Sequence, residues 1–120
     1  MSLLASLLAE LEEKREQLRR LNVCLARLGS LQGEFVQKRI LIEDPELTVK
    51  TWHGNLANEF LKVRDEMTFE YDDISNTQLG LSQQALSRKI AEIQRDIISL
   101  QASIAAERAR LAQERKESIG

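Results

Sequence analysis

Apolar residues recur at alternating spacings of three and four over two long stretches, which a short connection separates. In the first stretch the repeating positions hold Leu4, Leu7, Leu11, Leu18, Leu21, Leu25, Leu28 and Phe35, with Lys14 as the one exception. This spacing is typical of a coiled-coil helix, and it predicts a helix over residues 3–42. The helix is expected to stop before Pro45, because the residue that precedes a proline disfavours the helical conformation.

The second stretch predicts a helix over 55–74, an interruption over 75–82 and a helix over 83–117. Its first part carries an apolar stripe at helical spacing, formed by Leu56, Phe60, Val63, Met67, Tyr71 and Ile74. Ser, Asn, Thr and Gly then gather in 75–82 and disfavour helix, which predicts a kink or a break. The last part carries a heptad stripe, with Glu107 as its only lapse: Leu86, Ile90, Ile93, Ile97, Leu100, Ile104 and Leu111.

These elements predict one all-α domain, an antiparallel, coiled-coil-like helical hairpin with Trp52 and Gly54 at a bend over 43–54. At 1.5 Å per residue the first arm spans about 60 Å and the second, if continuous, about 93 Å. A bend near residue 48 pairs Leu25 with the region of Asp73 and leaves roughly 30 Å of the second arm unmatched. That overhang would carry Ile97 through Leu111, so it predicts either a fold-back at Gly80 or a partner chain.

Composition and charge exclude several classes of partner. Leu, Ala, Glu and Arg dominate, which suits long helices, and the net charge is −2. Residues 44–74 hold eight acids and three bases, which argues against a nucleic-acid partner, because such proteins need a basic surface. No run approaches the ~20 apolar residues of a membrane span. Glu10, Glu12 and Glu13 interrupt the apolar start, which also lacks the basic leader of a signal peptide. We therefore expect synthesis as a cytoplasmic protein without membrane insertion.

No group of residues predicts catalysis or a cofactor. Cys24 is the only cysteine and His53 the only histidine, and helical rise places them roughly 30 Å apart. Without a nucleophile–base pair or a metal-ligand cluster, the chain is expected to be no enzyme and to hold no metal. Trp52 is expected to pack over the bend beside Leu56 and Phe60, and the alternative is an exposed anchor for a partner.

Around this bend the sequence carries a motif. Residues 51–60 read Trp-x-Gly-x-x-Ala-x-x-Phe through Trp52, Gly54, Ala57 and Phe60, with His53 inside it. Together with Asp44-Pro45-Glu46-Leu47 and Thr77-Gln78-Leu79, the motif resembles the YwqH-like family of the Trp-x-Gly superfamily, small helical partners of LXG toxins in Gram-positive bacteria. The resemblance implies a non-enzymatic targeting partner or chaperone, which binds the helical N-terminal domain of an LXG toxin and assists its type VII secretion.

The resemblance also raises the question of an export signal. Members of the superfamily often end in an aromatic-x-x-x-acidic signal, whereas the tail after Leu111 has no aromatic residue. Phe69 and Asp73 match the pattern in mid-chain. The signal is therefore expected on a second small helical partner, and secretion of this chain with its cargo stays open. The alternative function is a self-associating coiled-coil structural protein, in which a homo-oligomer covers the overhang.

Overall fold

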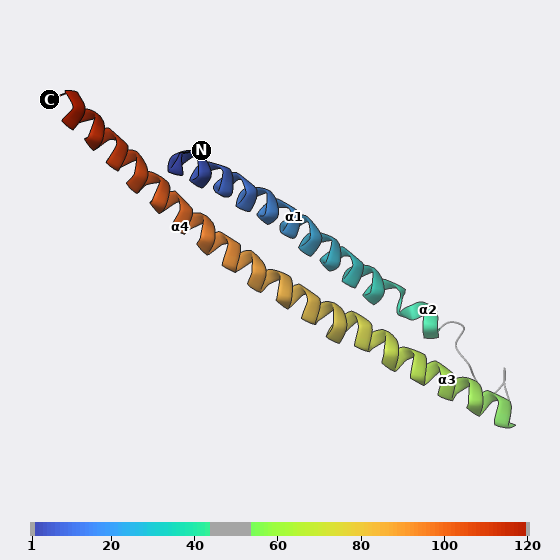
Figure 1. The fold of residues 1–120 in the computed structure, drawn as a ribbon. Helices are drawn as coiled ribbons and strands as arrows, with labels where there is room; N and C mark the ends of the chain where they lie inside the picture. Colours follow the sequence, from blue (N-terminus) through green and yellow to red (C-terminus); the bar gives the residue numbers. More distant parts are fainter. Residues whose placement is uncertain (1, 44–53, 120) are drawn as a thin grey trace. The chain divides into compact units, whose positions relative to one another are not determined.

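The computed structural model describes residues 2–43 and 54–119, and within these ranges all residues except Ser2 and Arg39 are helical. The helices are α1 (Leu3–Lys38), α2 (Ile40–Glu43), α3 (Gly54–Asp72), the π-helix η1 (Asp73–Gln78) and α4 (Leu79–Ile119) (Figure 1). The predicted all-α helical hairpin is confirmed. Trp52 and His53 lie outside the described residues, while Gly54 begins α3 and Ala57 lies within it.

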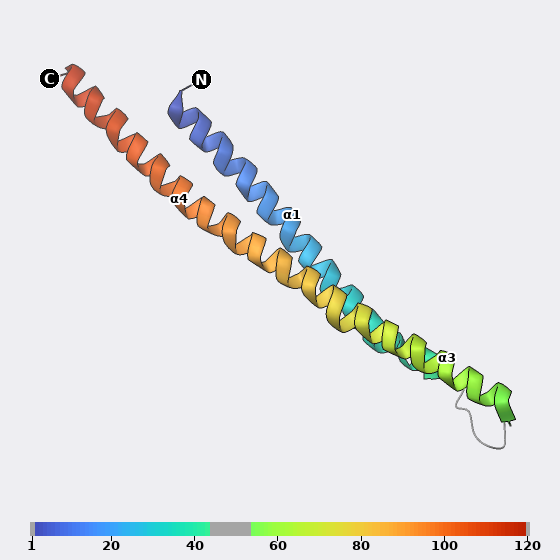
Figure 2. The same cartoon turned by 60° about the horizontal axis from the view of Figure 1, so that its bottom comes forward.

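The contacts divide the chain into two units, and both α1 and α4 contribute to each of them. Unit 1 joins the residues up to Cys24 with those from Leu86 onward. Here the first part of α1 and the larger part of α4 run antiparallel, side by side (Figures 1 and 2). Four apolar side chains form the buried core, and all four occupy predicted heptad positions: Leu11, Ile90, Ile93 and Ile104.

Lys14 is the polar exception in the first heptad stripe, and it faces the second arm. Its ammonium lies 3.5 Å from a carboxylate oxygen of Asp96 on α4. Its four methylenes can cover apolar surface while the charged end stays in water. A lysine is thus tolerated at this position because an acidic residue stands opposite.

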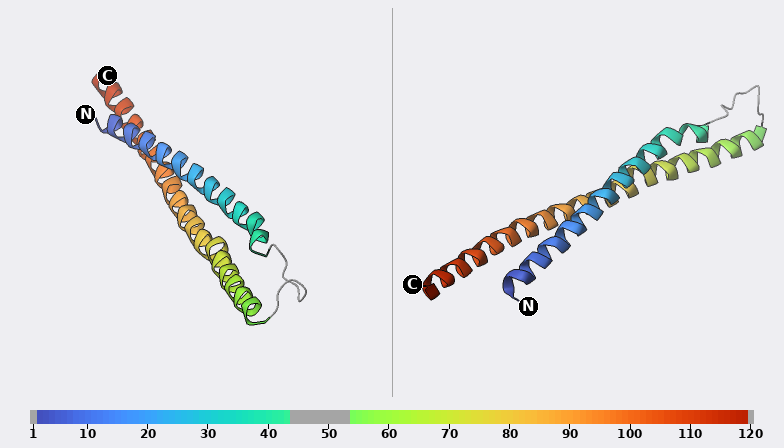
Figure 3. Two further views of the ribbon diagram at one scale, coloured as in Figure 1. Left: turned by 90° about the vertical axis from the view of Figure 1, so that its right-hand side faces the viewer. Right: turned by 90° about the horizontal axis from the view of Figure 1, so that it is seen from above.

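Unit 2 joins residues 25–85 and packs the end of α1, with α2, against α3 and η1 (Figure 3). The rings of Phe35 and Tyr71 lie 4.8 Å apart between centroids, a tilted arrangement that aromatic pairs favour. The expected single helix over 3–42 is interrupted at Arg39. The amide of Ile42 bonds to the carbonyl of Arg39 at 3.1 Å, a three-residue bond that tightens the last turn.

The irregularity predicted for 75–82 is present, but as a π-helix rather than a break. η1 covers Asp73–Gln78 and α4 begins directly at Leu79, so the predicted new start at residue 83 is wrong. Gly80 lies inside α4, which excludes the fold-back there. Ser75 is buried, and the side-chain amide of Gln32 donates to its carbonyl at 2.7 Å. A partner from the other arm thus satisfies a carbonyl at the point where the α-helical pattern changes.

The π-helix also shifts the inward-facing positions of the second arm. The covered residues step through Arg64, Thr68, Tyr71, Ser75, Leu79 and Gln83. In strict heptads, spacings of three and four residues alternate. The last three spacings here, from Tyr71 to Gln83, are all four, so this stretch holds about one residue more than the heptad pattern. A π-turn accommodates such an extra residue. The inner face therefore stays turned toward α1 through η1.

Candidate interaction surface

The stripe of α4 that was expected to bind a partner is largely covered within unit 1. Ile93 is 1% exposed and Ile104 5%, and Ile97, Leu100, Leu86 and Leu111 are half-buried. The prediction of an unmatched overhang from Ile97 is therefore wrong. The reason is the register, that is, which residues of the two arms stand opposite each other. Lys14 faces Asp96, whereas a pairing of Leu25 with Asp73 would have placed Lys14 opposite about residue 84.

A shorter overhang does exist at the end of α4. With Lys14 opposite Asp96, helical rise places the start of α1 level with about residue 107, which leaves roughly 18 Å of α4 beyond it. Figures 1–3 show α4 extending past the start of α1. Apart from half-buried Leu111, this end carries mainly alanine and charged side chains. It is therefore a poor apolar docking site.

Glu107, the lapse in the heptad stripe, is held by its own helix. It is 8% exposed, and Arg110 donates to its two carboxylate oxygens at 3.0 and 2.6 Å. These hydrogen bonds lower the pKa of Glu107. Arg110 also pairs with Glu114. A carboxylate can occupy the seam here because an arginine one turn further on balances its charge.

Exposed apolar side chains gather instead on α3. We call Leu56, Phe60, Val63 and Met67 the α3 stripe, and these residues are 64, 41, 53 and 52% exposed. Arg64 lies over the Phe60 ring at 5.2 Å. Among the residues of α3 whose burial is described, the covered ones are Arg64, Thr68, Tyr71 and Asp72. The motif residue Phe60 thus belongs to an exposed surface, and Leu56, expected beside the Trp52 ring, is the most exposed member of the stripe.

The mid-chain match to the export signal, Phe69 with Asp73, lies at the end of α3 and the start of η1. Phe69 is 75% exposed, and it borders a shallow groove of about 440 Å³ together with Lys62, Asp65, Glu66 and Glu70. Asp73 begins η1, is half-buried and accepts a hydrogen bond from Gln78 at 2.9 Å. The two residues are therefore one turn apart, with the aromatic ring accessible.

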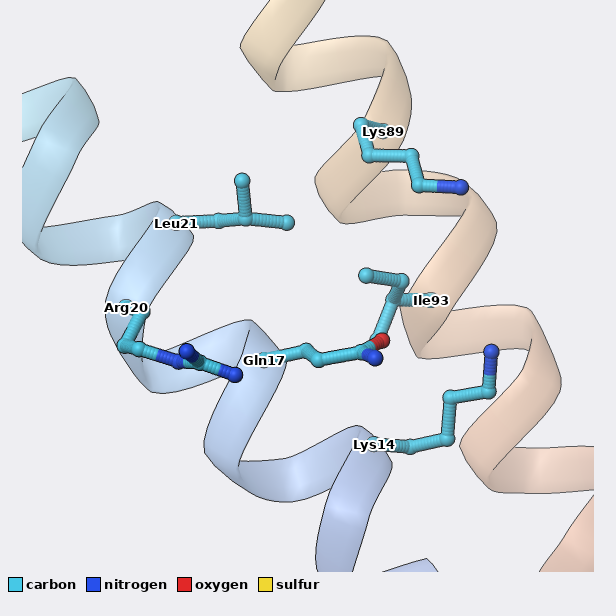
Figure 4. Close-up of a pocket in the computed structure, with 6 residues that line it drawn as sticks. All are labelled: Lys14, Gln17, Arg20, Leu21, Lys89 and Ile93. Atoms are coloured by element: carbon cyan, nitrogen blue, oxygen red, sulfur yellow. The ribbon is translucent and has the colours of Figure 1, made fainter. Parts of the chain in front are cut away.

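A second groove, in unit 1, has a basic lining (Figure 4). It has a volume of about 480 Å³ and is lined by Lys14, Gln17, Arg20, Leu21, Lys89 and Ile93. Each cation has a carboxylate nearby: Asp96 lies 3.5 Å from Lys14, Glu92 lies 3.3 Å from Lys89 and Glu16 lies 4.0 Å from Arg20. Because these carboxylates balance the positive charge, the groove is a weak site for an anion.

One ion pair links the two arms of unit 2. Arg39 donates to both carboxylate oxygens of Asp72, from Nε at 2.7 Å and from Nη2 at 3.0 Å. This two-point geometry is the strong form of an arginine–carboxylate pair. The hydrogen bonds from Arg39 lower the pKa of Asp72 below its ordinary value of 3.8.

Asp72→Asn is expected to make the chain less stable at neutral pH, with a difference from the wild type that vanishes in acid. A lowered folded-state pKa means that the stabilisation is present above the unfolded value and is lost as pH falls through the folded value. Urea unfolding at neutral pH and at a series of pH values that falls from 3.8 through the lowered pKa of the folded state measures the difference. Asp65→Asn, at an exposed carboxylate of the same helix, is the matched control. A constant difference at all pH values would contradict this role for the pair.

Cys24 is exposed, and no three side chains that ligate metals cluster within residues 2–43 and 54–119. None of the helices described is long and apolar enough to cross a membrane. Comparison with protein-family models, with curated proteins and with solved structures finds no match.

Proposed function

We propose that this chain is a non-enzymatic partner that binds the helical N-terminal domain of an LXG-type toxin and assists its export by type VII secretion. The α3 stripe is the main observation in its support. A hairpin that buries Ile93 and Ile104 between its arms still exposes four large apolar residues in heptad spacing on one helix. Such a surface is typical of a helix that binds another helix.

The resemblance of Trp52, Gly54, Ala57 and Phe60 to the Trp-x-Gly pattern supplies the identity of this partner. A helical toxin domain would pack along the hairpin and extend its coiled coil, and a second small helical partner would join the complex. The chain would be synthesised in the cytoplasm and would carry the toxin to the secretion machinery. In this proposal the protein contributes binding surface and no chemistry.

Co-expression with the product of a neighbouring gene that encodes a long helical N-terminus and a toxin-like C-terminus tests this function. We expect the two proteins to co-purify and to elute as one complex, with light scattering giving a mass above that of either chain. An unrelated coiled-coil domain is the control and should not co-purify. A stable homo-oligomer indifferent to the toxin domain would instead support the alternative, a self-associating structural protein.

A further inference from the structure

The α3 stripe is bordered by acidic residues on one side. Leu56 and Val63 share one heptad position, and Phe60 and Met67 share the other. Glu59 and Glu66 each stand one residue before the second set, at the position that flanks a coiled-coil seam, and both are exposed. Residues at flanking positions form the ion pairs that select the partner in a coiled coil.

On the other flank of the stripe, Tyr71 already packs within unit 2. Arg64 and Tyr71 each follow one residue after a seam position. Both are half-buried, and the Tyr71 ring packs on Phe35 of the first arm. Glu59 and Glu66 are therefore exposed charges with which the flank of an incoming helix can form ion pairs.

We propose that the α3 stripe binds an amphipathic helix with an apolar seam and with lysine or arginine at the positions that face Glu59 and Glu66. Opposite charges would fix the side and the direction of docking. The proposal deepens the proposed function by giving the toxin helix a chemical character, and it can be tested without the toxin.

A second copy of this chain is a poorer occupant on grounds of charge. In a twofold contact between two α3 helices, residues of one flank meet the same flank of the partner if the helices are antiparallel. Glu59 and Glu66 would then face their own copies, and like charges repel. A parallel contact would use the flank of Arg64 and Tyr71, where the Tyr71 ring already packs on Phe35 of the first arm and Arg64 lies over the Phe60 ring of its own helix. In the antiparallel arrangement the charges therefore favour a different helix with basic flanks over a second copy of this chain.

A labelled synthetic peptide of four heptads tests this with the full-length chain. Its seam positions hold leucine and its flanking positions lysine, and a matched peptide holds glutamate in place of lysine. Fluorescence anisotropy should show binding of the lysine peptide at least about tenfold tighter than of the glutamate peptide. Glu59→Lys with Glu66→Lys should invert this preference, and Val63→Ser with Met67→Ser should weaken binding of the lysine peptide at least about tenfold.

Two variants elsewhere serve as matched controls. Ile98→Ser removes an apolar side chain that is 66% exposed on α4, and Glu12→Lys with Glu13→Lys reverses two exposed charges on α1. Both should bind the lysine peptide as the wild type does. Since the residues of the stripe are exposed, Val63→Ser with Met67→Ser should also melt at nearly the wild-type temperature.

Several results would overturn the proposed surface. The wild type could bind both peptides equally or bind neither of them. The control variants could lose as much affinity for the lysine peptide as the stripe variant does. The wild type could also form a dimer that Val63→Ser with Met67→Ser dissociates. The proposed function fails separately. If the toxin domain binds the wild type and the Val63/Met67 variant alike, the surface is wrong and the function stands. If the lysine peptide binds as expected but no toxin domain co-purifies, the surface stands and the function is wrong.

Discussion

Ile93→Ala is expected to lower the free energy of unfolding by about 2–4 kcal/mol, as isoleucine truncations in packed cores do. Ile93 is 1% exposed, and Figure 4 shows it pointing toward Gln17 and Leu21 of α1. The truncated side chain loses apolar burial and leaves a cavity that two stiff helices close only in part. Urea unfolding followed by far-ultraviolet circular dichroism measures the change.

Ile98→Ala on the same helix is the matched control for that loss. Ile98 is 66% exposed, so its truncation should change the free energy of unfolding by no more than about 0.5 kcal/mol. Equal effects of the two substitutions would show that Ile93 does not occupy a packed seam, and the antiparallel contact of unit 1 would then be wrong.

Ile104→Glu is expected to destabilise the chain by roughly 3–5 kcal/mol, because it removes apolar burial and places a carboxylate where little water reaches. Ile104 is 5% exposed. Glu107, one turn further on, is also covered and already takes both hydrogen bonds from Arg110. The new carboxylate would therefore meet a like charge.

Ser103→Glu adds the same charge one residue earlier, at an exposed position, and should leave the unfolding curve almost unchanged. The pair of variants also separates the two registers of the hairpin. If Ile104 lay on an unmatched overhang, Ile104→Glu would unfold like the wild type and would affect only a partner-binding assay. A stability loss confined to Ile104→Glu would support the observed register.

The repeating positions of α1 and α4 could be predicted from the sequence, but the pairing between them could not. A heptad pattern looks alike after each shift of seven residues, so it indicates which face is buried and not which residue stands opposite. The ion pair of Lys14 with Asp96 distinguishes the register, and surface charges are too frequent here for one such pair to be singled out. The register expected from the sequence therefore differed from the observed one by several helical turns.

On α3 the apolar pattern marks an exposed face. Leu56, Phe60, Val63 and Met67 show clear helical spacing, yet the covered residues among the described part of α3 are Arg64, Thr68, Tyr71 and Asp72. Periodicity shows that an apolar stripe exists. Whether that stripe faces the first arm or stays exposed for another chain depends on how η1 shifts the heptad positions of α3. A π-turn leaves little trace in a single sequence beyond the weak helix formers Ser75, Asn76 and Thr77. The packing expected of Trp52 stays a prediction, since Trp52 and His53 lie outside the described residues.

The π-helix has a consequence for how the sequence of the second arm can evolve. With an ordinary α-helix over 73–78, the heptad phase of Leu79 and Gln83 would continue back onto Asp72, Phe69, Asp65 and Lys62. Phe69, Asp65 and Lys62 would then turn inward beside Asp72, which already pairs with Arg39, and Tyr71 would leave Phe35. The extra residue thus offsets the heptad phase of α3 by about one position from that of Leu79 and Gln83. Insertion or deletion of one residue within 73–78 would therefore change which face of α3 is buried while the heptad positions after Leu79 stay the same.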